Sequence, residues 1–472
     1  MLLASSASTP YQSQSGRVLL GACAAIFVAC MMGILLRPIG YLSVFWPANQ
    51  VLLVLILRYP RVLLQPISLA AIFSSFMVAD LVTGASFWVS AGFTVANMAG
   101  ASAAWLILRK QSERNLQMEG QYSALLVFYA SGVAALISAS IGAPISMYAF
   151  NIPVIKALLM WWTGEWMNAM ILLPFLLALP TARKTALPHD KAQGLALALP
   201  LLAVVILEGA SYTVSDKVGS LVFSLPALLW CALTYRILTT TLITMLVFVT
   251  KIIVSLAGSM DFTPAHYVDV ATLRLGITML ILGPLSVAGA HAARSELLHR
   301  MRYQAHHDSL TDVLSRNGFV QASNALLKRI MHERSSVAVL MLDLDHFKRV
   351  NDTYGHATGD KLLRAFTCTM TQTLRPQDLL GRIGGEEFAV VLPRISTEEA
   401  ATIAERLCQA VRTGGFETMN SEPLPATVSI GVSYIAQLGP HDSIEDLLRD
   451  ADVALYQAKG SGRDRVVLGP VR

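Results

Sequence analysis

Apolar residues form long, nearly uninterrupted runs over the first three fifths of the chain. Ten such runs lie at residues 18–37, 41–57, 62–79, 85–108, 123–148, 154–179, 195–213, 219–234, 238–257 and 270–292. A helix of about 20 apolar residues crosses the ~30 Å hydrocarbon core of a bilayer, and most of the runs reach this length. The second and the eighth are shorter. The pattern predicts a multi-span helical membrane domain of about ten spans, too many for one cleavable signal peptide.

Beyond residue 307 the pattern changes to short strands and amphipathic helices. Helices are predicted at 316–333, at 346–374 with an interruption before Asp360, at 397–413 and at 443–458. Strands are predicted at 337–342, 379–383, 388–392 and 426–434. The second and third strands form a hairpin through Gly384-Gly385-Glu386-Glu387. This alternation predicts an α+β domain built on a central sheet.

The two predicted domains are joined by a segment that favours helix. Residues 292–304 contain neither Gly nor Pro, so the last membrane helix is predicted to continue through them. Leu297, Leu298, Met301 and Gln304 fall near helical spacing and form a narrow seam suited to pairing with a second copy of the chain. We expect a membrane domain at 18–292, a connecting helix at 293–307 and an α+β domain at 308–469.

Charge is distributed as unevenly as hydrophobicity. Only 14% of the 472 residues are charged, against roughly a quarter in an ordinary soluble protein. The first 299 positions hold 26 charged residues and the last 173 hold 41. The second part has a net charge of −1, which excludes a basic nucleic-acid-binding domain there. The five cysteines form no CxxC pair, so neither a disulfide framework nor a zinc ribbon is predicted.

Loop cations predict the orientation, because Lys and Arg are retained on the cytoplasmic side of a membrane. With the N-terminus inside, the outer loops carry only Arg37 and Lys217. The inner loops carry Arg17, Arg58, Arg61, Arg109, Lys110, Arg114, Arg183, Lys184, Lys191 and Arg236. An even number of spans returns the chain to the inner side near Arg294. The α+β domain is therefore expected in the cytoplasm, anchored in membrane lipid.

Three ionisable residues inside the apolar runs are candidate sensor residues, since each is costly in a membrane unless it is paired or hydrated. Glu208 and Lys251 fall at similar depth in the seventh and ninth runs, so we expect them to form an ion pair. For Lys251 a structural polar contact explains the residue at least as well as a ligand site. Glu165 lies among three tryptophans, which favours a ligand or signal pocket.

Short motifs in the membrane part resemble a known input domain. They are the segment Phe45-Trp46-Pro47-Ala48-Asn49-Gln50, the pair Ala96-Asn97 and the tryptophan-rich segment before Glu165. Together they resemble the membrane-associated sensor (MASE) type 1 family of bacterial signalling proteins, over about residues 18–292. The resemblance implies an input domain in the bacterial inner membrane without saying what is sensed.

Acidic residues stand where the predicted strands end. Asp343 closes the buried strand, and strand alternation puts Asp345 on the same face unless it already lies in the turn. Glu386 follows a Gly-Gly turn, where missing side chains permit positive φ and close approach of a substrate. If the hairpin pairs beside the first strand, Asp343 and Glu386 converge into an oxygen site for Mg²⁺. Taken alone, such paired acids are more often solvated surface.

Groups that suit phosphate lie beside these acids in the sequence. His346, Phe347 and Lys348 open a helix, so their free N–H groups can hold phosphate oxygens. Lys459 and Arg463 offer cations to the same phosphates. No GxxxxGK[ST] motif occurs in the chain, which excludes a Walker-type site.

Five strings identify a family when they are taken together. They are DSLTDVLSRNGF, LDLDHFKRVNDTYGHATGDKLL, RPQDLLGRIGGEEF, TVSIGVS and ADVALYQAKGSGRDRV. In this order and spacing they resemble the GGDEF domain of diguanylate cyclases, here as a GGEEF variant, over about residues 300–468. The resemblance implies a nucleotidyl-cyclase-like fold with a mainly antiparallel sheet. It also implies the condensation of two GTP molecules to cyclic di-GMP and two pyrophosphates.

The resemblance assigns roles to individual residues. The metal ligands, for Mg²⁺ or Mn²⁺, are Asp343, the Leu344 carbonyl and Glu386. The catalytic residues are Glu386 and Glu387, one of which assists loss of the 3′-hydroxyl proton. Asn351 and Asp360 read guanine, and a carboxylate at 360 suits the N1–H and 2-amino donors that adenine does not offer in this arrangement. From spacing alone, Asn351 is better explained as a turn residue.

The family reaction also implies a homodimer and feedback by the product. Each domain holds one GTP and attacks the nucleotide of the other, so neither half-site completes the reaction alone. Arg375 and Asp378 match the Arg-x-x-Asp offset of the family's product-inhibition site, with Arg406 of a partner domain as a third member. On the residues alone, an Arg/Asp surface pair is common and worth ~0–1 kcal/mol.

Three other functions are alternatives to a diguanylate cyclase. A catalytically silent receptor for cyclic di-GMP or GTP needs the loss of only one site residue, and all of those named above are intact. A transporter with a regulatory nucleotide domain is prompted by the spans and the buried charges. A class III cyclase shares the general layout but has neither the GGEEF hairpin nor the Arg-x-x-Asp offset.

Overall fold

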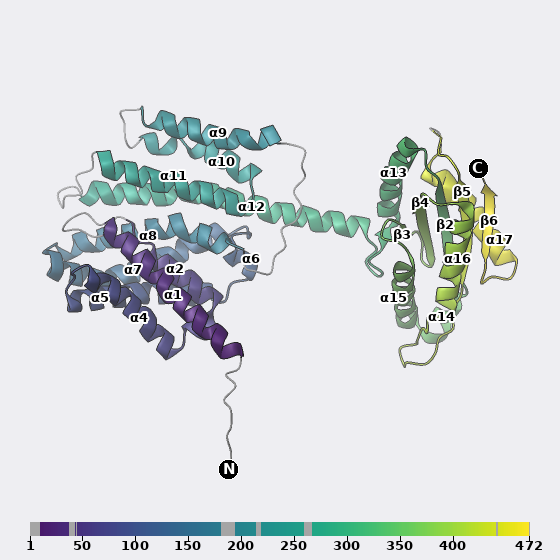
Figure 1. Cartoon of the computed structure of the whole chain (residues 1–472), viewed down its shortest axis with the longest axis horizontal. Coiled ribbons are helices and arrows are strands. Elements are labelled where there is room, and N and C mark those ends of the chain that lie inside the picture. The colour runs from purple at the N-terminus through teal and green to yellow at the C-terminus, as the bar shows by residue number, and fades with distance from the viewer. Residues whose placement is uncertain are drawn as a thin grey trace, which may run out of the picture. The chain divides into compact units, whose positions relative to one another are not determined.

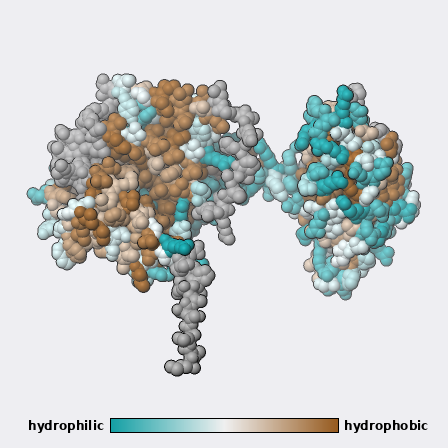
Figure 2. All heavy atoms as spheres, in the orientation of Figure 1, coloured by the Kyte–Doolittle hydropathy of each residue, from teal (hydrophilic) through white to brown (hydrophobic). Residues whose placement is uncertain are grey.

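The structure of the chain is a computed structural model (Figure 1), which describes residues 10–36, 43, 45–180, 194–213, 219–258, 267–439 and 442–471. The chain divides into two compact units, Met1–Glu296 and Leu297–Arg472. Figure 2 shows a largely apolar surface on the first unit and a largely polar one on the second. Five loop cations used for the orientation lie outside the described residues: Arg37, Arg183, Lys184, Lys191 and Lys217.

The described part of the first unit is helical (Figure 1). Its longer helices are α1 (Pro10–Leu35), α4 (Pro66–Val82), α5 (Phe87–Leu108), α7 (Ser123–Phe150), α8 (Val154–Ala178), α9 (Gly194–Ser211), α11 (Ile237–Gly258) and α12 (Tyr267–His306). Its shorter ones are α2 (Ala48–Arg58), α3 (Pro60–Leu63), α6 (Glu113–Leu116), the 3₁₀ turn η1 (Gly219–Val222) and α10 (Leu225–Thr234). Each predicted apolar run overlaps a helix.

Among the described residues, five helices are long and apolar enough to cross a membrane, namely α1, α5, α7, α11 and α12. Four more apolar helices, α2, α4, α9 and α10, have lengths of 10–17 residues over their described parts. The 11 residues of α2 correspond to about 16 Å at 1.5 Å per residue. α8 has 25 residues, but Glu165 and Asn168 lower its mean hydropathy. These helices are compatible with insertion in a membrane.

Small residues allow α7 to approach its neighbours closely, as is common between membrane helices. A Cβ built on Gly100 of α5 lies 2.9 Å from the Cβ of Ser138 on α7. On α7 itself, Gly142 makes room for the ring of Trp161 and Gly132 for that of Trp166. The α8 tryptophans are therefore held against α7 by the absence of side chains there.

α12 continues without a break from Tyr267 to His306, over 40 residues. It passes the boundary between the two units, as the lack of Gly and Pro in residues 292–304 predicted. Four large side chains of its last part are exposed: Leu297, Leu298, Met301 and Tyr303.

The second unit is an α+β domain with a mixed sheet in the order β1-β3-β4-β2-β5-β6. The strands are β1 (Leu314–Ser315), β2 (Val337–Leu344), β3 (Leu379–Arg382), β4 (Glu387–Pro393), β5 (Val428–Ile435) and β6 (Val466–Val471). The four inner strands pair antiparallel, and β1 and β6 add parallel edges. The four inner strands were predicted, whereas β1 and β6 were missed because they are short or interrupted by Gly and Pro.

Helices cover both faces of this sheet, which explains the continuous apolar run of β2. They are α13 (Arg316–Glu333), α14 (Phe347–Tyr354), α15 (His356–Thr373), α16 (Thr397–Arg412) and α17 (Ile444–Gly460). One core contains side chains of α14, α15 and α16, and the other those of α13 and α17. Gly355, with φ 80°, separates α14 from α15.

Candidate functional site

The C-terminal end of β2 carries a buried carboxylate. Asp343 is 6% exposed and stands opposite Glu387 of β4 in the sheet. Glu386, the residue before β4, lies close enough to Asp343 for the two carboxyl groups to interact electrostatically. Burial raises the pKa of both carboxyls, and the negative charge of Asp343 raises that of Glu386 further. The structure therefore brings Asp343 and Glu386 together at one end of the sheet.

Main-chain hydrogen bonds hold the glycine hairpin against this strand end. The N–H of Leu344 donates to the carbonyl of Glu386 at 3.3 Å, and that of Ile383 to the carbonyl of Glu387 at 2.8 Å. Neither Gly384 nor Gly385 has a positive φ, so the turn does not use the conformational freedom that glycine permits. The glycines supply space instead. A Cβ on Gly384 would lie 2.5 Å from Glu387 Oε2, and nothing lies within 4 Å of one on Gly385.

Arg382 stabilises the same turn. It was not predicted as a site residue from the sequence. Its Nη2 donates to the carbonyl of Gly385 at 2.7 Å, and its Nη1 lies 2.9 Å from Asp308 Oδ1. Asp308 begins the string DSLTDVLSRNGF, and it also accepts from the Thr311 hydroxyl at 2.7 Å. The sequence offered one sign of this contact, the acidic Asp308 in a recognised string. Its partner, Arg382, is 74 positions away, so the contact could not be predicted from the sequence.

Lys459 is the immediate counter-charge of the acidic strand end. Its Nζ lies 2.7 Å from Asp343 Oδ2, with the lysine side chain 32% exposed and the aspartate 8%. Lys459 and Arg463 both favour the ionised form of Asp343, against the larger effect of burial. From the sequence, Lys459 and Arg463 were predicted to bind phosphates, and the ion pair of Lys459 with Asp343 was not predicted.

Asp345 has a structural position, although alternation put it on the face of Asp343. It is 8% exposed. Its carboxylate accepts from the hydroxyls of Thr427 at 2.8 Å and Ser429 at 2.7 Å, and from the N–H of Asp464 at 3.1 Å. Asp345 thus ties the end of β2 to β5 and to the loop that follows Arg463.

The proposed phosphate-binding segment begins α14. His346 precedes the helix in the left-handed conformation, with φ 57°, and Phe347 is its first residue. The N–H groups of Phe347 and Lys348 belong to the first turn of the helix. Such N–H groups have no hydrogen-bond acceptor within their own helix. These donors directly follow the strand that carries Asp343.

Asn351 and Asp360 flank the corner between α14 and α15. The carbonyl of Asn351 accepts from Gly355 N at 2.9 Å, at the C-terminal end of α14. Its side-chain oxygen packs against Gly359, where a Cβ would overlap it. Asp360 follows Gly359 and is partly exposed. The two residues assigned to guanine by resemblance are therefore brought to one corner.

Arg375, Asp378 and Arg406 share one surface of the second unit. Arg375 N donates to Asp378 Oδ2 at 2.8 Å, and Asp378 N to the carbonyl of Arg375 at 3.0 Å. Arg406 of α16 donates to the carbonyl of Thr373 at 2.8 Å. Burial raises the pKa of Asp378, and Arg375 and Arg406 act in the opposite direction. Arg406 thus lies beside Asp378 of its own domain.

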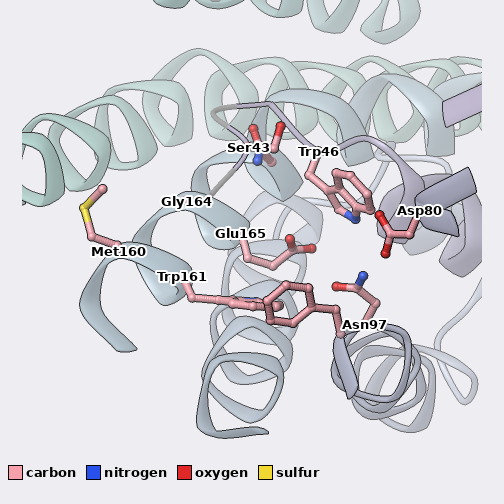
Figure 3. Close-up of a pocket in the computed structure, with 10 residues that line it drawn as sticks. Ser43, Trp46, Asp80, Asn97, Met160, Trp161, Gly164 and Glu165 are labelled. Carbon is pink, nitrogen blue, oxygen red and sulfur yellow. The ribbon is translucent and has the colours of Figure 1, made fainter. Parts of the chain in front are cut away.

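In the first unit, three separate segments meet at Glu165. Asn49 Nδ2 donates to Glu165 Oε1 at 2.8 Å, and Gln50 Nε2 donates to the same oxygen at 3.0 Å. Asn49 Nδ2 also donates to Asn97 Oδ1 at 3.1 Å. Figure 3 shows Glu165, Asn97 and Trp46 around a common space. The motifs that carried the sensor resemblance therefore surround one carboxylate.

Glu208 and Lys251 form the predicted ion pair. Lys251 Nζ lies 2.9 Å from Glu208 Oε2, and the two side chains are 4% and 13% exposed, lysine first. The pair joins α9 to α11.

The donor set at the end of β2 fits a hard divalent cation. Among the described residues, no group of three or more His, Cys, Asp and Glu side chains forms a metal site. The available oxygens are the carboxylates of Asp343 and Glu386 and the neighbouring Leu344 carbonyl. Mg²⁺ is usually bound by one or two carboxylates and completed by water and substrate phosphates. Two desolvated carboxyls beside the open space at Gly385 meet that requirement.

This fold and site define a class of enzyme. A mixed sheet flanked by helices, with carboxylates converging at a glycine-rich hairpin, is the arrangement of a nucleotidyl-cyclase-like domain. A family model described as "Diguanylate cyclase, GGDEF domain" matches residues 305–465.

Two known proteins are similar over most of the chain. A probable diguanylate cyclase DgcF of Escherichia coli O157:H7 is 31% identical over 444 residues, which cover 92% of this chain and 91% of that protein. The protein of the same name from strain K12 is 33% identical over 311 residues, 65% of this chain and 95% of its own length. The chain belongs to the GGDEF diguanylate cyclase family and is an enzyme of that class.

Among solved structures, the coiled coil and GGDEF domain of DgcB from Caulobacter crescentus, in complex with c-di-GMP, is similar. It is 29% identical, covers 37% of this chain and 92% of its own length, and gives a TM-score of 0.35.

Proposed function

We propose that this chain is a membrane-bound, Mg²⁺-dependent diguanylate cyclase that acts as a homodimer and is controlled by its membrane unit. The observation that carries the proposal is the convergence of Asp343 and Glu386 beside Lys459 at the open end of β2. The membrane domain comprises residues 18–292, the connecting helix 293–307 and the cyclase domain 308–469.

Each group of the site has a role in the condensation of two GTP molecules. Asp343, Glu386 and the Leu344 carbonyl would hold the metal, which when bound neutralises developing charge and aligns the triphosphate. Lys459 neutralises Asp343; were the carboxylate to hold a metal, the ammonium group would be released to bind phosphate oxygens.

The remaining residues orient the nucleotide and move a proton. The N–H groups that begin α14, at His346, Phe347 and Lys348, hold phosphate oxygens together with Arg463. Glu386 or Glu387 accepts the proton of the attacking 3′-hydroxyl. Asn351 and Asp360 accept from the N1–H and 2-amino groups of guanine, so that ATP leaves them unpaired.

Two surfaces support homodimerisation and inhibition of the enzyme by its product. Leu297 and Met301, near the end of α12, are 58% and 56% exposed. Apolar side chains this exposed would be stabilised by burial against a second copy of the chain, which supports a homodimer. Pairing brings two half-sites together. The surface of Arg375, Asp378 and Arg406 is the proposed inhibitory site for cyclic di-GMP, because two cations beside a partly buried acid suit a guanine nucleotide with phosphates.

The membrane unit is proposed to be a MASE-type input domain of the bacterial inner membrane, with the cyclase domain in the cytoplasm. Its support is the meeting of Asn49, Gln50 and Asn97 at Glu165. Glu165 is thus a sensor candidate, whereas Glu208 and Lys251 neutralise each other and are better explained as a link between helices.

The test uses the full chain in lipid nanodiscs, with cyclic di-GMP formation measured at saturating GTP and Mg²⁺. We expect Asp343→Asn and Glu386→Gln each to lower the rate by at least about 100-fold, since each removes charge held at the reacting phosphates. Asp352→Asn is the matched control, because Asp352 is an exposed acid on α14.

Turnover by Asp343→Asn and Glu386→Gln at the rate of the unaltered chain would refute the proposed site. An unaltered, dimeric chain that binds cyclic di-GMP but forms none from GTP would be a silent receptor. Substrate uptake by vesicles that Glu208→Ala abolishes, with cyclase activity retained, would favour a transporter.

A further inference from the structure

A small cavity lies beside Glu165 in the first unit (Figure 3). Its wall includes Trp46, Asp80, Phe93, Asn97, Trp161 and Asn168. The free space inside is about 60 Å³, whereas a single water needs ~10–15 Å³ on this measure. The Glu165 cavity therefore has room for a few waters or for a ligand of a few non-hydrogen atoms.

Two carboxylates line the cavity, those of Glu165 and Asp80. Asp80 has an interaction partner of its own, so the charge to be balanced is that of Glu165. Among the described residues no basic side chain is ion-paired with Glu165, whose Oε1 accepts from the amides of Asn49 and Gln50. Arg274, a buried cation of α12, donates from Nη1 to the carbonyl of Met160 at 2.7 Å. A ligand that brings positive charge would balance Glu165.

Buried amide oxygens around Glu165 lack donors. Asn168 Oδ1, on a residue that lines the cavity and is only 2% exposed, has no hydrogen-bond partner. Asn49 Oδ1 and Gln50 Oε1 also lack one, but these residues line a second cavity that Glu165 borders as well. For Asn49 and Gln50 the assignment of the amide atoms is settled by contact, because each nitrogen faces the carboxylate of Glu165. A buried acceptor without a partner is destabilising. The group missing at Asn168 is therefore a hydrogen-bond donor.

Aromatic rings complete the wall. The rings of Phe93 and Trp161 are 5.2 Å apart between centroids and tilted by 60°, and the indole of Trp46 lines the same space. Aromatic faces attract ammonium groups within about 6 Å, whereas small metal cations prefer a shell made only of oxygens. Carboxylates, amide oxygens and aromatic rings together select an ammonium group that carries N–H donors.

Two residues of the cavity wall, Met160 and Gly164, contact the helix that leaves the membrane unit. The Arg274 side chain of α12 packs on Gly164, where a Cβ would come within 2.9 Å of Nη1, and it holds the carbonyl of Met160 on the cavity wall. α12 then continues to His306. In the predicted orientation, Asp80 near the end of α4 and Asn97 in the first half of α5 both fall in the outer half of the membrane.

We propose that the Glu165 cavity is a binding site for a small primary ammonium cation that enters from the outer side. The ligand balances Glu165 and donates to the unpaired Asn168 Oδ1. Its occupancy changes the contact between α8 and α12 at Arg274. Through α12 it alters cyclase output, and this last step alone rests on the proposed function.

The binding test uses the full chain in nanodiscs and follows tryptophan fluorescence during titration with ethylammonium chloride at constant ionic strength. Ethanol is the uncharged ligand of the same size, and potassium chloride tests for an alkali ion. We expect saturation with ethylammonium alone and at least tenfold weaker binding to Glu165→Gln. The double variant Glu208→Gln/Lys251→Met, which neutralises a buried pair that is not among the residues lining the cavity, should bind like the unaltered chain.

A second variant keeps the test decisive if Glu165→Gln does not fold. Asn168→Leu removes an unpaired acceptor, so the empty protein should melt higher while its ethylammonium affinity falls at least fivefold. Equal binding of ethanol or potassium, or unchanged affinity in both Glu165→Gln and Asn168→Leu, would overturn the site.

Cyclase activity separates the two levels of the proposal. Saturating ethylammonium should change cyclic di-GMP formation in the unaltered chain, and Arg274→Met should abolish that response without abolishing binding. Binding with no change in a measurable rate would overturn the coupling through α12. Binding to a chain that forms no cyclic di-GMP under any condition would contradict the proposed function and leave the ammonium site standing.

Discussion

Replacing Gly359 by alanine tests the guanine-binding corner without touching a charged group. A Cβ at this position overlaps Asn351 Oδ1 and lies 3.0 Å from Asn351 Cγ and 3.1 Å from Phe347 Cζ. The amide of Asn351 must therefore turn away from α15. The proposed contact between Asn351 and the guanine edge of GTP is then lost.

The size of the effect follows from one hydrogen bond. Leaving a polar group of the base unpaired costs about 1–3 kcal/mol, or roughly 5- to 150-fold in affinity. We expect the KM for GTP to rise about tenfold, with a smaller change in kcat. Crowding at the corner costs about 1–3 kcal/mol, and alanine in a helix returns about 0.5–1 kcal/mol, so the melting temperature should fall by up to about 10 °C.

The assay measures initial rates of cyclic di-GMP formation against GTP concentration for four chains: unaltered, Gly359→Ala, Asn351→Ala and the double variant. Because Gly359→Ala acts through Asn351, it should add little to Asn351→Ala. Gly460→Ala is the control, since nothing lies within 4 Å of a Cβ there. An unchanged KM in a folded Gly359→Ala protein, or fully additive effects in the double variant, would refute the reasoning.

Three further predictions concern charge, feedback and packing. Burial raises the pKa of Glu386, so its stabilising contribution is complete below its unfolded pKa of about 4.3 and is lost as pH rises through the folded value. Metal-free Glu386→Gln should therefore melt above the unaltered chain at pH 7.5 but not below pH 4, and Mg²⁺ should raise only the melting temperature of the unaltered chain. Arg375→Ala should abolish inhibition by added cyclic di-GMP while initial rates stay within about twofold; retained inhibition would remove the product site. Gly431→Ala should lower the melting temperature of the second unit strongly, because a Cβ there overlaps the backbone of α17 at Ala451 and Leu455; a shift as small as that of Gly460→Ala would contradict this packing.

Local pattern was enough to predict most elements of the second unit. α13 was predicted at its observed limits, because its apolar residues recur at helical spacing from Arg316 to Glu333. β2 was predicted because an eight-residue strand buried throughout its length needs apolar residues on both faces. β6 was missed since Gly469 and Pro470 interrupt its pattern, and it is a strand because it pairs with β5 at the sheet edge.

Part of the membrane unit could also be predicted. The depth of Glu208 and Lys251 in their runs predicted an ion pair, because two opposite charges in a low-dielectric region are stabilised by each other. The flanking tryptophans indicated a pocket at Glu165. They did not reveal that Asn49 and Gln50, 116 and 115 positions away, donate to it.

The amino-acid sequence by itself determined the two-domain plan, the positions of the helices and inner strands, and the residue types available for metal, phosphate and guanine. These follow from local periodicity and from the chemistry of each side chain. Only the tertiary structure decided that Lys459 neutralises Asp343, that Asp345 is used up in hydrogen bonds, and that unpaired amide oxygens surround Glu165. Such contacts join residues far apart in the chain, and their geometry depends on how the helices and sheet pack.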